Sequence, residues 1–282
     1  MSALVTAPAP DRDPARAVNP RQILDLLDGG VVRAAQPDPV APGGWRVDAT
    51  VKAAILALFA ERGERRWEVG PFAFADRAAL PPKRLGDGPD ARAAAEAGRP
   101  WRIVPGGTSL RAGAHLEPGV VIMPPSFVNV GAWIGEATMI DSHVLVGSCA
   151  QIGARVHLAA GVIVGGVLEP PGARPVIVED EAFIGAGCGL YEGVLVGRGA
   201  VLAAGVVLTG TSRLYDVVRE QLIEGTPDAP LAIPEWAVVV PGTRGVASEF
   251  GRAHGLGIST AVIVKDRDAR TDARAALEEA LR

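Results

Sequence analysis

Aliphatic residues recur at every sixth position through the middle of this chain. The frame shifts once by eight residues, across 170–177, and the aliphatic positions are Val104, Leu110, Leu116, Ile122, Val128, Ile134, Ile140, Val146, Ile152, Leu158, Val164, Val178, Ile184, Leu190, Val196, Leu202 and Leu208. The residue four positions after each of them is nearly always small or β-branched. A helix repeats every 3.6 residues and a strand every two, so neither alone gives this period.

A period of six is typical of a chain wound as a triangular prism. Each six-residue unit, or hexad, supplies one short strand and one corner, so three hexads complete a coil and the pattern makes between five and six coils. The aliphatic residue points inward, and stacked coils share parallel hydrogen bonds around one core. Hexapeptide repeats go with a left-handed parallel β-helix, an exception to the right-handed crossover rule. A β-sandwich, with strands every 8 to 12 residues or roughly so, would not hold this frame.

The residue directly after the aliphatic one is glycine in six hexads, at 135, 147, 153, 165, 185 and 197. We interpret these glycines as corner residues that tolerate unusual backbone angles. Asp141 takes this corner position within TMIDSHVLVGSCAQIG. An aspartate tolerated at a turn is the simpler interpretation, but its carboxylate would project from the prism and is a candidate functional group.

The flanking segments predict a mainly β fold with an N-terminal helical domain (1–99), the β-helix (100–213) and a small C-terminal α/β cap (214–282). The apolar patterns and end signals predict helices over 19–30 and 48–63, and a C-terminal helix over 271–282 capped by Thr271. Strands are expected over 236–247 and 259–268. Residues 1–18 and 80–98 are rich in proline, alanine and glycine, which favours a loose tail and a linker.

Composition excludes several classes of function. With 48% hydrophobic and 21% charged residues the chain is globular, and a net charge of -4 makes nucleic acid or an anionic membrane an unexpected partner.

No secretory leader or spanning segment is evident, so we expect a cytoplasmic protein. Cys149 and Cys188 are the only cysteines, too few for a disulfide framework or a thiolate-rich zinc site, and we expect both to pack in the interior.

Left-handed hexapeptide helices occur mostly in acyl-coenzyme A transferases, but zinc hydratases and structural proteins also have them. The fold therefore does not determine the function, and the residues that break the repeat are the evidence for it. Besides Asp141 these are the eight-residue insertion, which carries Arg174, and Arg102 directly before the first hexad. A protruding loop costs no core burial, and an arginine can bind a carboxylate through two hydrogen bonds.

Longer motifs give a specific resemblance. The segments RIVPGGTSLRAG, MPPSFVNVGAW, TMIDSHVLVGSCAQIG, GGVLEP, YEGVLV and AVIVK are similar to those of the tetrahydrodipicolinate N-succinyltransferases, and the similarity extends from about residue 19 to the C-terminus. The resemblance implies a homotrimer with active sites between neighbouring prisms. It also implies transfer of a succinyl group from succinyl-CoA to the amino group of L-2-amino-6-oxopimelate, in lysine and diaminopimelate biosynthesis.

Site residues follow from the same resemblance. Arg102 matches the family's substrate-binding arginine, and Asp141 matches the aspartate that contacts the substrate amine. For coenzyme A the resemblance suggests Gly166, Ala186 and Ala204 along the pantetheine arm, and Lys265 and Arg270 near the phosphates. No metal is expected.

The sequence departs from the family at the proposed general base. Better-known members have Arg-Ser-Glu where this chain reads Gly187, Cys188 and Gly189. Our first hypothesis is that Glu192 acts as the general base instead. The alternatives are that Asp141 acts without a second carboxylate, or that the acceptor is a different molecule. His143 stands where those members have tryptophan, and it could share the role of Asp141.

Other functions stay open at this point. Acetyl-CoA could replace succinyl-CoA as donor, on the same or a related amino-dicarboxylate, and Arg174 is one candidate partner for the succinyl carboxylate. A zinc site would need three converging imidazoles, whereas His115, His143 and His157 fall on different coils of the repeat. A non-catalytic solenoid is the remaining alternative.

Overall fold

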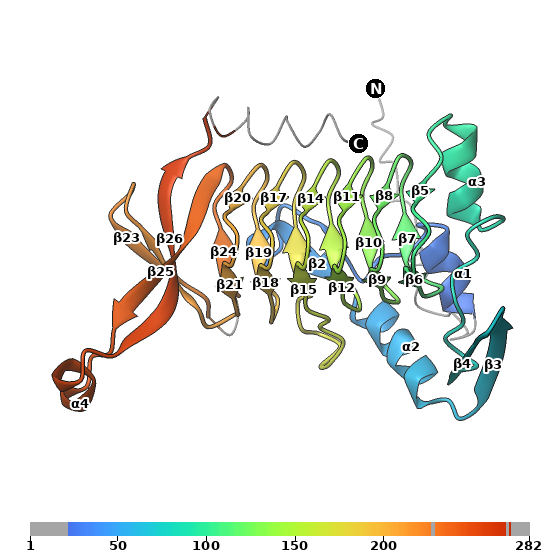
Figure 1. Cartoon of the computed structure of the whole chain (residues 1–282), viewed down its shortest axis with the longest axis horizontal. Coiled ribbons are helices and arrows are strands. Elements are labelled where there is room, and N and C mark those ends of the chain that lie inside the picture. The colour runs from blue at the N-terminus through green and yellow to red at the C-terminus, as the bar shows by residue number, and fades with distance from the viewer. Residues whose placement is uncertain (1–21, 227–228, 269–270, 272–282) are drawn as a thin grey trace, which may run out of the picture.

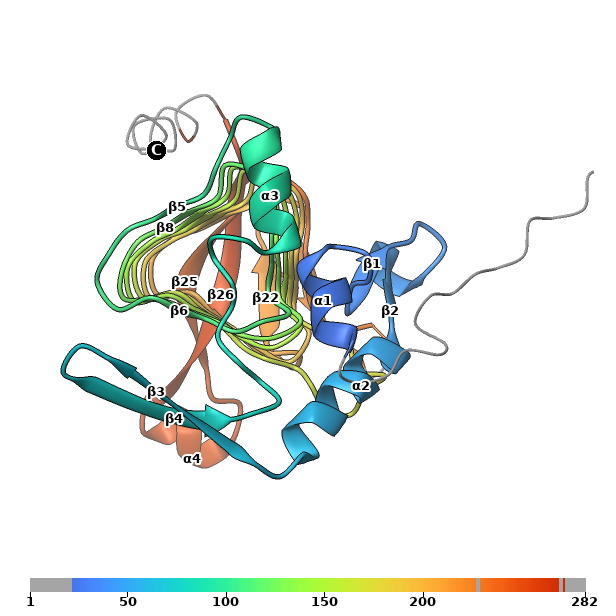
Figure 2. The ribbon, with the colours of Figure 1, turned by 90° about the vertical axis from the view of Figure 1, so that its right-hand side faces the viewer.

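The computed structural model describes residues 22–226, 229–268 and 271, and its central body is a three-sided prism of stacked coils (Figures 1 and 2). The first sheet holds β7 (His115–Leu116), β10 (Trp133–Ile134), β13 (Gln151–Ile152), β16 (Ile177–Val178), β19 (Leu195–Val196) and β24 (Ala232–Ile233). The second holds β5 (Arg102–Ile103), β8 (Val121–Ile122), β11 (Met139–Ile140), β14 (His157–Leu158), β17 (Phe183–Ile184), β20 (Val201–Leu202) and β25 (Ala237–Gly245). The third holds β6 (Ser109–Leu110), β9 (Phe127–Val128), β12 (Leu145–Val146), β15 (Ile163–Val164), β18 (Gly189–Leu190) and β21 (Val207–Leu208).

The aliphatic residues of the hexads form the core of the prism, as predicted. From Leu110 to Leu208 each of them is at most 4% exposed, and only Val104, before the first complete coil, is half-buried. Neighbouring strands pair in parallel and in register, so residues 18 apart stack where no insertion intervenes, as Ile134 does on Ile152. The predicted mainly β, parallel β-helical fold is therefore confirmed.

The glycines after the aliphatic residues have a different cause from the one expected. None of the six has a positive φ; the left-handed residues lie two positions later, at sites such as Gly187 and His143. Successive coils instead approach closely at these glycines: a Cβ on Gly135 would lie 2.4 Å from the carbonyl carbon of Gly153. These glycines permit close contact between coils, so the explanation by unusual backbone angles is wrong for them.

Replacing Gly147 with alanine is therefore expected to destabilise the prism. The added Cβ would lie 2.2 Å from the backbone nitrogen of Gly166, and the two coils would have to separate. We expect a loss of about 3 kcal/mol in the free energy of unfolding, measured by urea denaturation. Gly172→Ala is the matched control, because no atom lies within 4 Å of its Cβ position. Equal midpoints for the two variants would contradict this explanation.

The N-terminal segment packs on the first sheet (Figure 2). Its elements are α1 (Ile23–Asp28), β1 (Ala35–Pro37), β2 (Trp45–Val47), α2 (Ala49–Ala60), β3 (Glu64–Val69), β4 (Phe72–Arg77) and α3 (Pro89–Glu96). The helices predicted over 19–30 and 48–63 are confirmed as α1 and α2, and the Asp48 carboxylate accepts a hydrogen bond from Val51 N at 2.9 Å. The hairpin β3–β4 was not predicted, and the stretch 80–98, expected to be a linker, contains α3.

His115 lies where this segment meets the prism. Its Nδ1 is 2.9 Å from the carbonyl oxygen of Asp28, and its ring packs against that of Trp133, tilted by 35° with 4.0 Å between ring centres. Burial lowers the pKa of His115 from 6.5 to about 4.

Stability is therefore expected to fall as the pH drops from 6.5 towards 4. The unfolded chain takes up a proton on His115 in this range and the folded chain does not, so the full contribution is present only above pH 6.5. The loss attributable to this residue is about 3 kcal/mol at pH 4. Denaturation at pH 7 and pH 4.5 should show a smaller difference for His115→Gln than for the wild type, and equal differences would refute the assignment.

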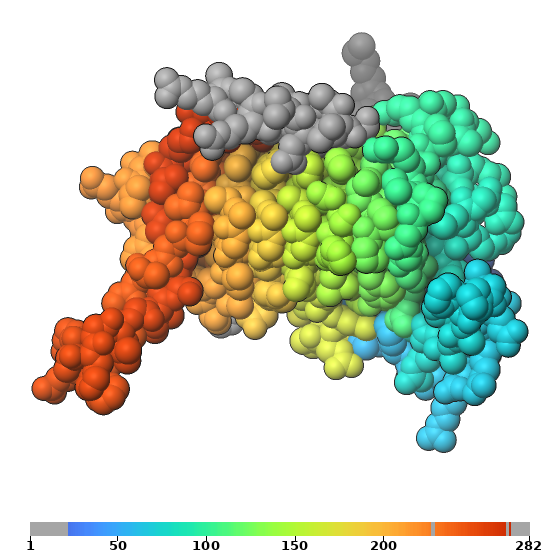
Figure 3. All heavy atoms as spheres, viewed as in Figure 1, coloured from blue at the N-terminus to red at the C-terminus, as the bar shows by residue number. Residues whose placement is uncertain are grey.

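The C-terminal part forms a twisted sheet at the other end of the prism. The strands expected over 236–247 and 259–268 are confirmed as β25 and β26 (Gly257–Asp266), which pair with each other. β26 also pairs with β22 (Arg213–Asp216), and β22 pairs with β23 (Gln221–Glu224). The helix α4 (Glu249–Ala253) lies at the tip of the β25–β26 hairpin, which stands clear of the prism (Figure 3). The helix expected over 271–282 lies outside the described residues apart from Thr271. No helix in the described ranges is long and apolar enough to span a membrane.

Candidate functional site

The prism has three edges, and the sequence-predicted site residues lie on different ones. The Asp141 edge joins the second sheet to the third, through turns such as 141–144. The Glu192 edge joins the third to the first, through turns such as 191–194. The groove edge joins the first to the second, through turns such as 135–138.

Asp141 lies at the end of β11, half-buried, with no basic side chain paired to it among the described residues. Its Oδ1 accepts a hydrogen bond from the backbone N–H of Ser142 at 2.6 Å, and its own carbonyl oxygen accepts one from Ser126 Oγ at 2.9 Å. His143, two residues on, is exposed and has φ 62°, while its N–H donates to the carbonyl of Pro125. The turn therefore fixes the carboxylate and leaves an imidazole beside it.

A stripe of small residues follows Asp141 along the same edge. The next three turns read Ala-Ala-Gly (159–161), Gly-Ala-Gly (185–187) and Ala-Ala-Gly (203–205), and their middle residues are exposed. The N–H of Gly187 donates to the carbonyl of Ala160, and that of Gly205 donates to the carbonyl of Ala186, so the turns stack directly. The structure thus places Ala186 and Ala204, two of the predicted coenzyme A contacts, on one line with Asp141.

The other predicted contacts lie elsewhere. Gly166 is on the Glu192 edge, where a Cβ would lie 2.8 Å from the backbone nitrogen of Ser148, so close packing of coils alone accounts for this glycine. Arg102 is exposed at the start of β5, two coils before β11. Lys265 on β26 forms an ion pair with Asp268 at 2.7 Å, and Arg270 lies outside the described residues.

Glu192 is separated from Asp141 and lies close to Arg174 instead. Both side chains line a cavity of about 450 Å³ on the Glu192 edge. Glu192 is exposed, and its Oε2 accepts a hydrogen bond from Gly210 N at 3.2 Å. Arg174 donates from Nε to the carbonyl of Gly193 at 3.1 Å and from Nη2 to that of Pro230 at 2.9 Å. One chain alone does not bring Asp141 and Glu192 together.

Tyr191 explains the glycine at the position of the family's glutamate. Gly189 lies on β18, and a Cβ there would lie 2.7 Å from Tyr191 Cε2 and 3.0 Å from its hydroxyl oxygen. The phenol thus occupies the space that a side chain at 189 would enter. Sequence reasoning used Tyr191 only as the first residue of the motif YEGVLV and assigned no role to its side chain.

The histidines considered for a zinc site lie in three different places. His115 is on the first sheet, His143 on the Asp141 edge and His157 on the second sheet. Within the described ranges, no group of three or more His, Cys, Asp or Glu side chains could hold a metal ion.

Comparison with known proteins extends this description. Residues 175–210 match the family model described as the hexapeptide repeat of succinyl-transferase. Three proteins named 2,3,4,5-tetrahydropyridine-2,6-dicarboxylate N-succinyltransferase are similar along nearly the whole chain. Those of Rhodopseudomonas palustris, Methylorubrum populi and Idiomarina loihiensis are 42%, 39% and 39% identical, and each alignment covers 93% of this chain and 88% of the relative. Identity at this level over this length places the chain in the 2,3,4,5-tetrahydropyridine-2,6-dicarboxylate N-succinyltransferase family.

Proposed function

We propose that this protein succinylates the α-amino group of the opened form of tetrahydrodipicolinate, with succinyl-CoA as donor, in lysine and diaminopimelate biosynthesis. The observation that supports this most is the Asp141 edge, where a carboxylate with a fixed orientation stands at the head of an exposed stripe of small residues. The name shared by relatives at about 40% identity agrees with it.

The reaction needs a neutral amine held against a thioester. The amine nitrogen attacks the thioester carbonyl, the C–S bond breaks, coenzyme A leaves as the thiolate, and the amine gives up a proton. In our proposal Asp141 orients the amine and accepts that proton, which then passes to the thiolate. Arg102 binds one substrate carboxylate through two hydrogen bonds.

The pantetheine arm of coenzyme A lies along the stripe in this proposal. Ala186 and Ala204 leave the backbone accessible, and Lys265 faces the phosphates after exchanging its contact with Asp268. Holding the two reactants in this geometry contributes more than any single side chain, because well-oriented intramolecular reactions reach effective concentrations of about 10⁵ M or more.

A trimer would complete the site. The outward residues of the third sheet form a ladder of Phe127, Leu145, Ile163, Gly189 and Val207, in which Ile163 is 38% and Val207 57% exposed. Ile163 and Val207 border the Asp141 edge and are exposed within the described chain, whereas Gly189 between them is buried next to Tyr191. The two exposed side chains suit packing against a neighbouring prism. In such a trimer the Asp141 edge of one subunit would face a neighbour that supplies Arg102 or Glu192.

Measuring thiol release with both donors tests the proposed function. The wild type should release coenzyme A from succinyl-CoA only when tetrahydrodipicolinate is present, and more slowly from acetyl-CoA. Glu192→Gln should lower this rate by about 10²-fold if Glu192 is the second carboxylate. Full activity of that variant would leave Asp141 as the sole base, and no acceptor-dependent thiol release with either donor would contradict acyl transfer.

A further inference from the structure

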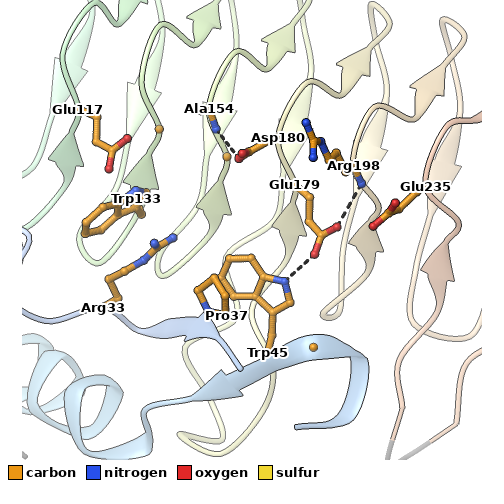
Figure 4. A pocket seen from close by; sticks show the side chains of 13 residues that line it. Arg33, Pro37, Trp45, Glu117, Trp133, Ala154, Glu179, Asp180, Arg198 and Glu235 are labelled. Carbon is orange, nitrogen blue, oxygen red and sulfur yellow. Dashed lines mark hydrogen bonds between the residues drawn. The ribbon is translucent and has the colours of Figure 1, made fainter. Parts of the chain in front are cut away.

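A second cavity lies on the groove edge, away from Asp141. It has a volume of about 370 Å³ and is bounded on one side by turns of the prism and on the other by the β1–β2 ribbon (Figure 4). Four carboxylates and two guanidinium groups line it, together with the indoles of Trp45 and Trp133.

Two of the carboxylates reach towards each other along the edge. Glu117 Oε2 accepts a hydrogen bond from the N–H of Glu136, and Asp180 Oδ1 accepts one from the N–H of Ala154, both at 2.8 Å. Those two N–H groups belong to adjacent coils, which lie about 4.8 Å apart. The second oxygen of each carboxylate accepts no hydrogen bond from any described residue. The floor between them is Gly135 and Gly153, which have no side chains to fill the space.

Arg33 supplies a positive charge in the same space. Its Nε donates to Gln151 Oε1 at 3.0 Å, and its guanidinium lies 3.9 Å from the ring centre of Trp133. Burial lowers the pKa of Arg33 to about 10, so it stays charged at neutral pH. Within the described ranges its Nη atoms have no hydrogen-bond partner, and no carboxylate lies within ion-pair distance. Figure 4 shows Arg33 and Asp180 pointing into the cavity from opposite sides.

This arrangement discriminates between classes of ligand. Arg33 would repel a simple cation, and Glu117 and Asp180 would repel a simple anion. A zwitterion satisfies both, because its anionic end can bind the free Nη donors while its ammonium group lies between the two carboxylates.

We propose that the groove binds a free α-amino acid, with its carboxylate on Arg33 and its ammonium between Glu117 and Asp180. The side chain then runs along the edge past Trp45 towards Glu179 and Glu235. Glu179 is already engaged by Trp45 Nε1 at 2.8 Å and by the N–H of Arg198 at 3.1 Å, while Glu235 is exposed. Neutral and basic side chains therefore fit and acidic ones are disfavoured, so the groove does not take the dicarboxylate acceptor.

Calorimetric titration of the full-length chain with four probes tests the ligand class. L-lysine and L-leucine should bind saturably, and L-glutamate and 1,5-diaminopentane at least tenfold more weakly. 1,5-Diaminopentane is L-lysine without its carboxylate, so binding as tight as that of L-lysine would overturn the role of Arg33. Absence of saturable binding of both L-lysine and L-leucine up to about 10 mM would overturn the site. No acyl-CoA is present, so the result is independent of the proposed acyl transfer.

Variants locate the binding. Glu117→Gln and Asp180→Asn each keep an oxygen for the backbone N–H and remove the charge, so the turns should stay folded. Each should weaken L-lysine binding at least tenfold, which corresponds to the loss of a hydrogen bond to a charged group. The matched control is Glu136→Gln, on the same edge but outside the groove and paired with Arg99. Unchanged affinity in both test variants, or equal weakening in the control, would refute the proposal.

Discussion

Asp141→Asn is expected to lower kcat/KM for acyl transfer by about 10²- to 10⁴-fold, the range found when a general base is removed. The asparagine has nearly the same shape and can still accept the hydrogen bond that Ser142 N donates at 2.6 Å, so the turn should persist. What the variant loses is the charge that orients the amine and the basic oxygen that takes up the proton released when the amine attacks. Steady-state thiol release with succinyl-CoA and tetrahydrodipicolinate measures the effect.

Ser142→Ala is the control for this experiment. It removes the neighbouring side chain but keeps the backbone N–H that binds Asp141. Its kcat/KM should stay within a few-fold of the wild type, and both variants should unfold at the wild-type temperature. A fully active Asp141→Asn variant would show that the carboxylate is only a turn residue, the simpler interpretation that the sequence alone left open.

Lys83→Met is expected to lower the free energy of unfolding by about 3–5 kcal/mol. Lys83 Nζ lies 2.6 Å from Asp28 Oδ1 and 2.6 Å from Asp90 Oδ2, and its side chain is 1% exposed. The two carboxylates also accept hydrogen bonds from Gly113 N and Leu116 N, so this cluster joins α1 and α3 to the first coils of the prism. Without the ammonium, two buried carboxylates are left uncompensated.

The pH dependence gives this prediction a second readout. Burial already raises the pKa of Asp28 above its ordinary value, so this carboxylate becomes neutral at a higher pH than an exposed one. The loss caused by Lys83→Met should therefore shrink as the pH falls. Arg84→Gln is the control, because its ion pair with Asp87 is exposed and its removal should change stability little. Urea denaturation in which both variants lose equally little would contradict the role assigned to Lys83.

The prism could be predicted from sequence because its six-residue period is unambiguous. Every aliphatic residue from Leu110 onwards is buried where the frame requires it. The reason for the glycines could not be predicted, because a close approach between coils involves residues 18 or more apart, such as Gly147 and Gly166. Sequence reasoning assigned them to unusual backbone angles, which occur at other positions of the hexad.

The number of hexads between Asp141 and Glu192 explains why the two residues lie on different edges. Seven hexads separate Ile140 from Leu190, through 146, 152, 158, 164, 178, 184 and 190, and seven is not a multiple of three. The two acidic residues must therefore lie on different edges of one prism. A shared site for the two would therefore need a second chain, as in the trimer proposed above.

The contacts of the N-terminal segment could not be predicted. Residues 80–98 have the composition of a linker, yet they contain α3 and the buried Lys83. Composition does not reveal which lysine forms ion pairs with two carboxylates from distant segments. The groove likewise is lined by Arg33, Glu117 and Asp180, which are far apart in sequence.

The most direct measurement is mass spectrometry of the acceptor after incubation with succinyl-CoA and the purified protein. We predict a product that carries one succinyl group on its amino nitrogen, formed by the wild type and not detectably by Asp141→Asn in the same time. Thiol release without a succinylated acceptor, or equal product from both proteins, would contradict amine acylation at the Asp141 edge.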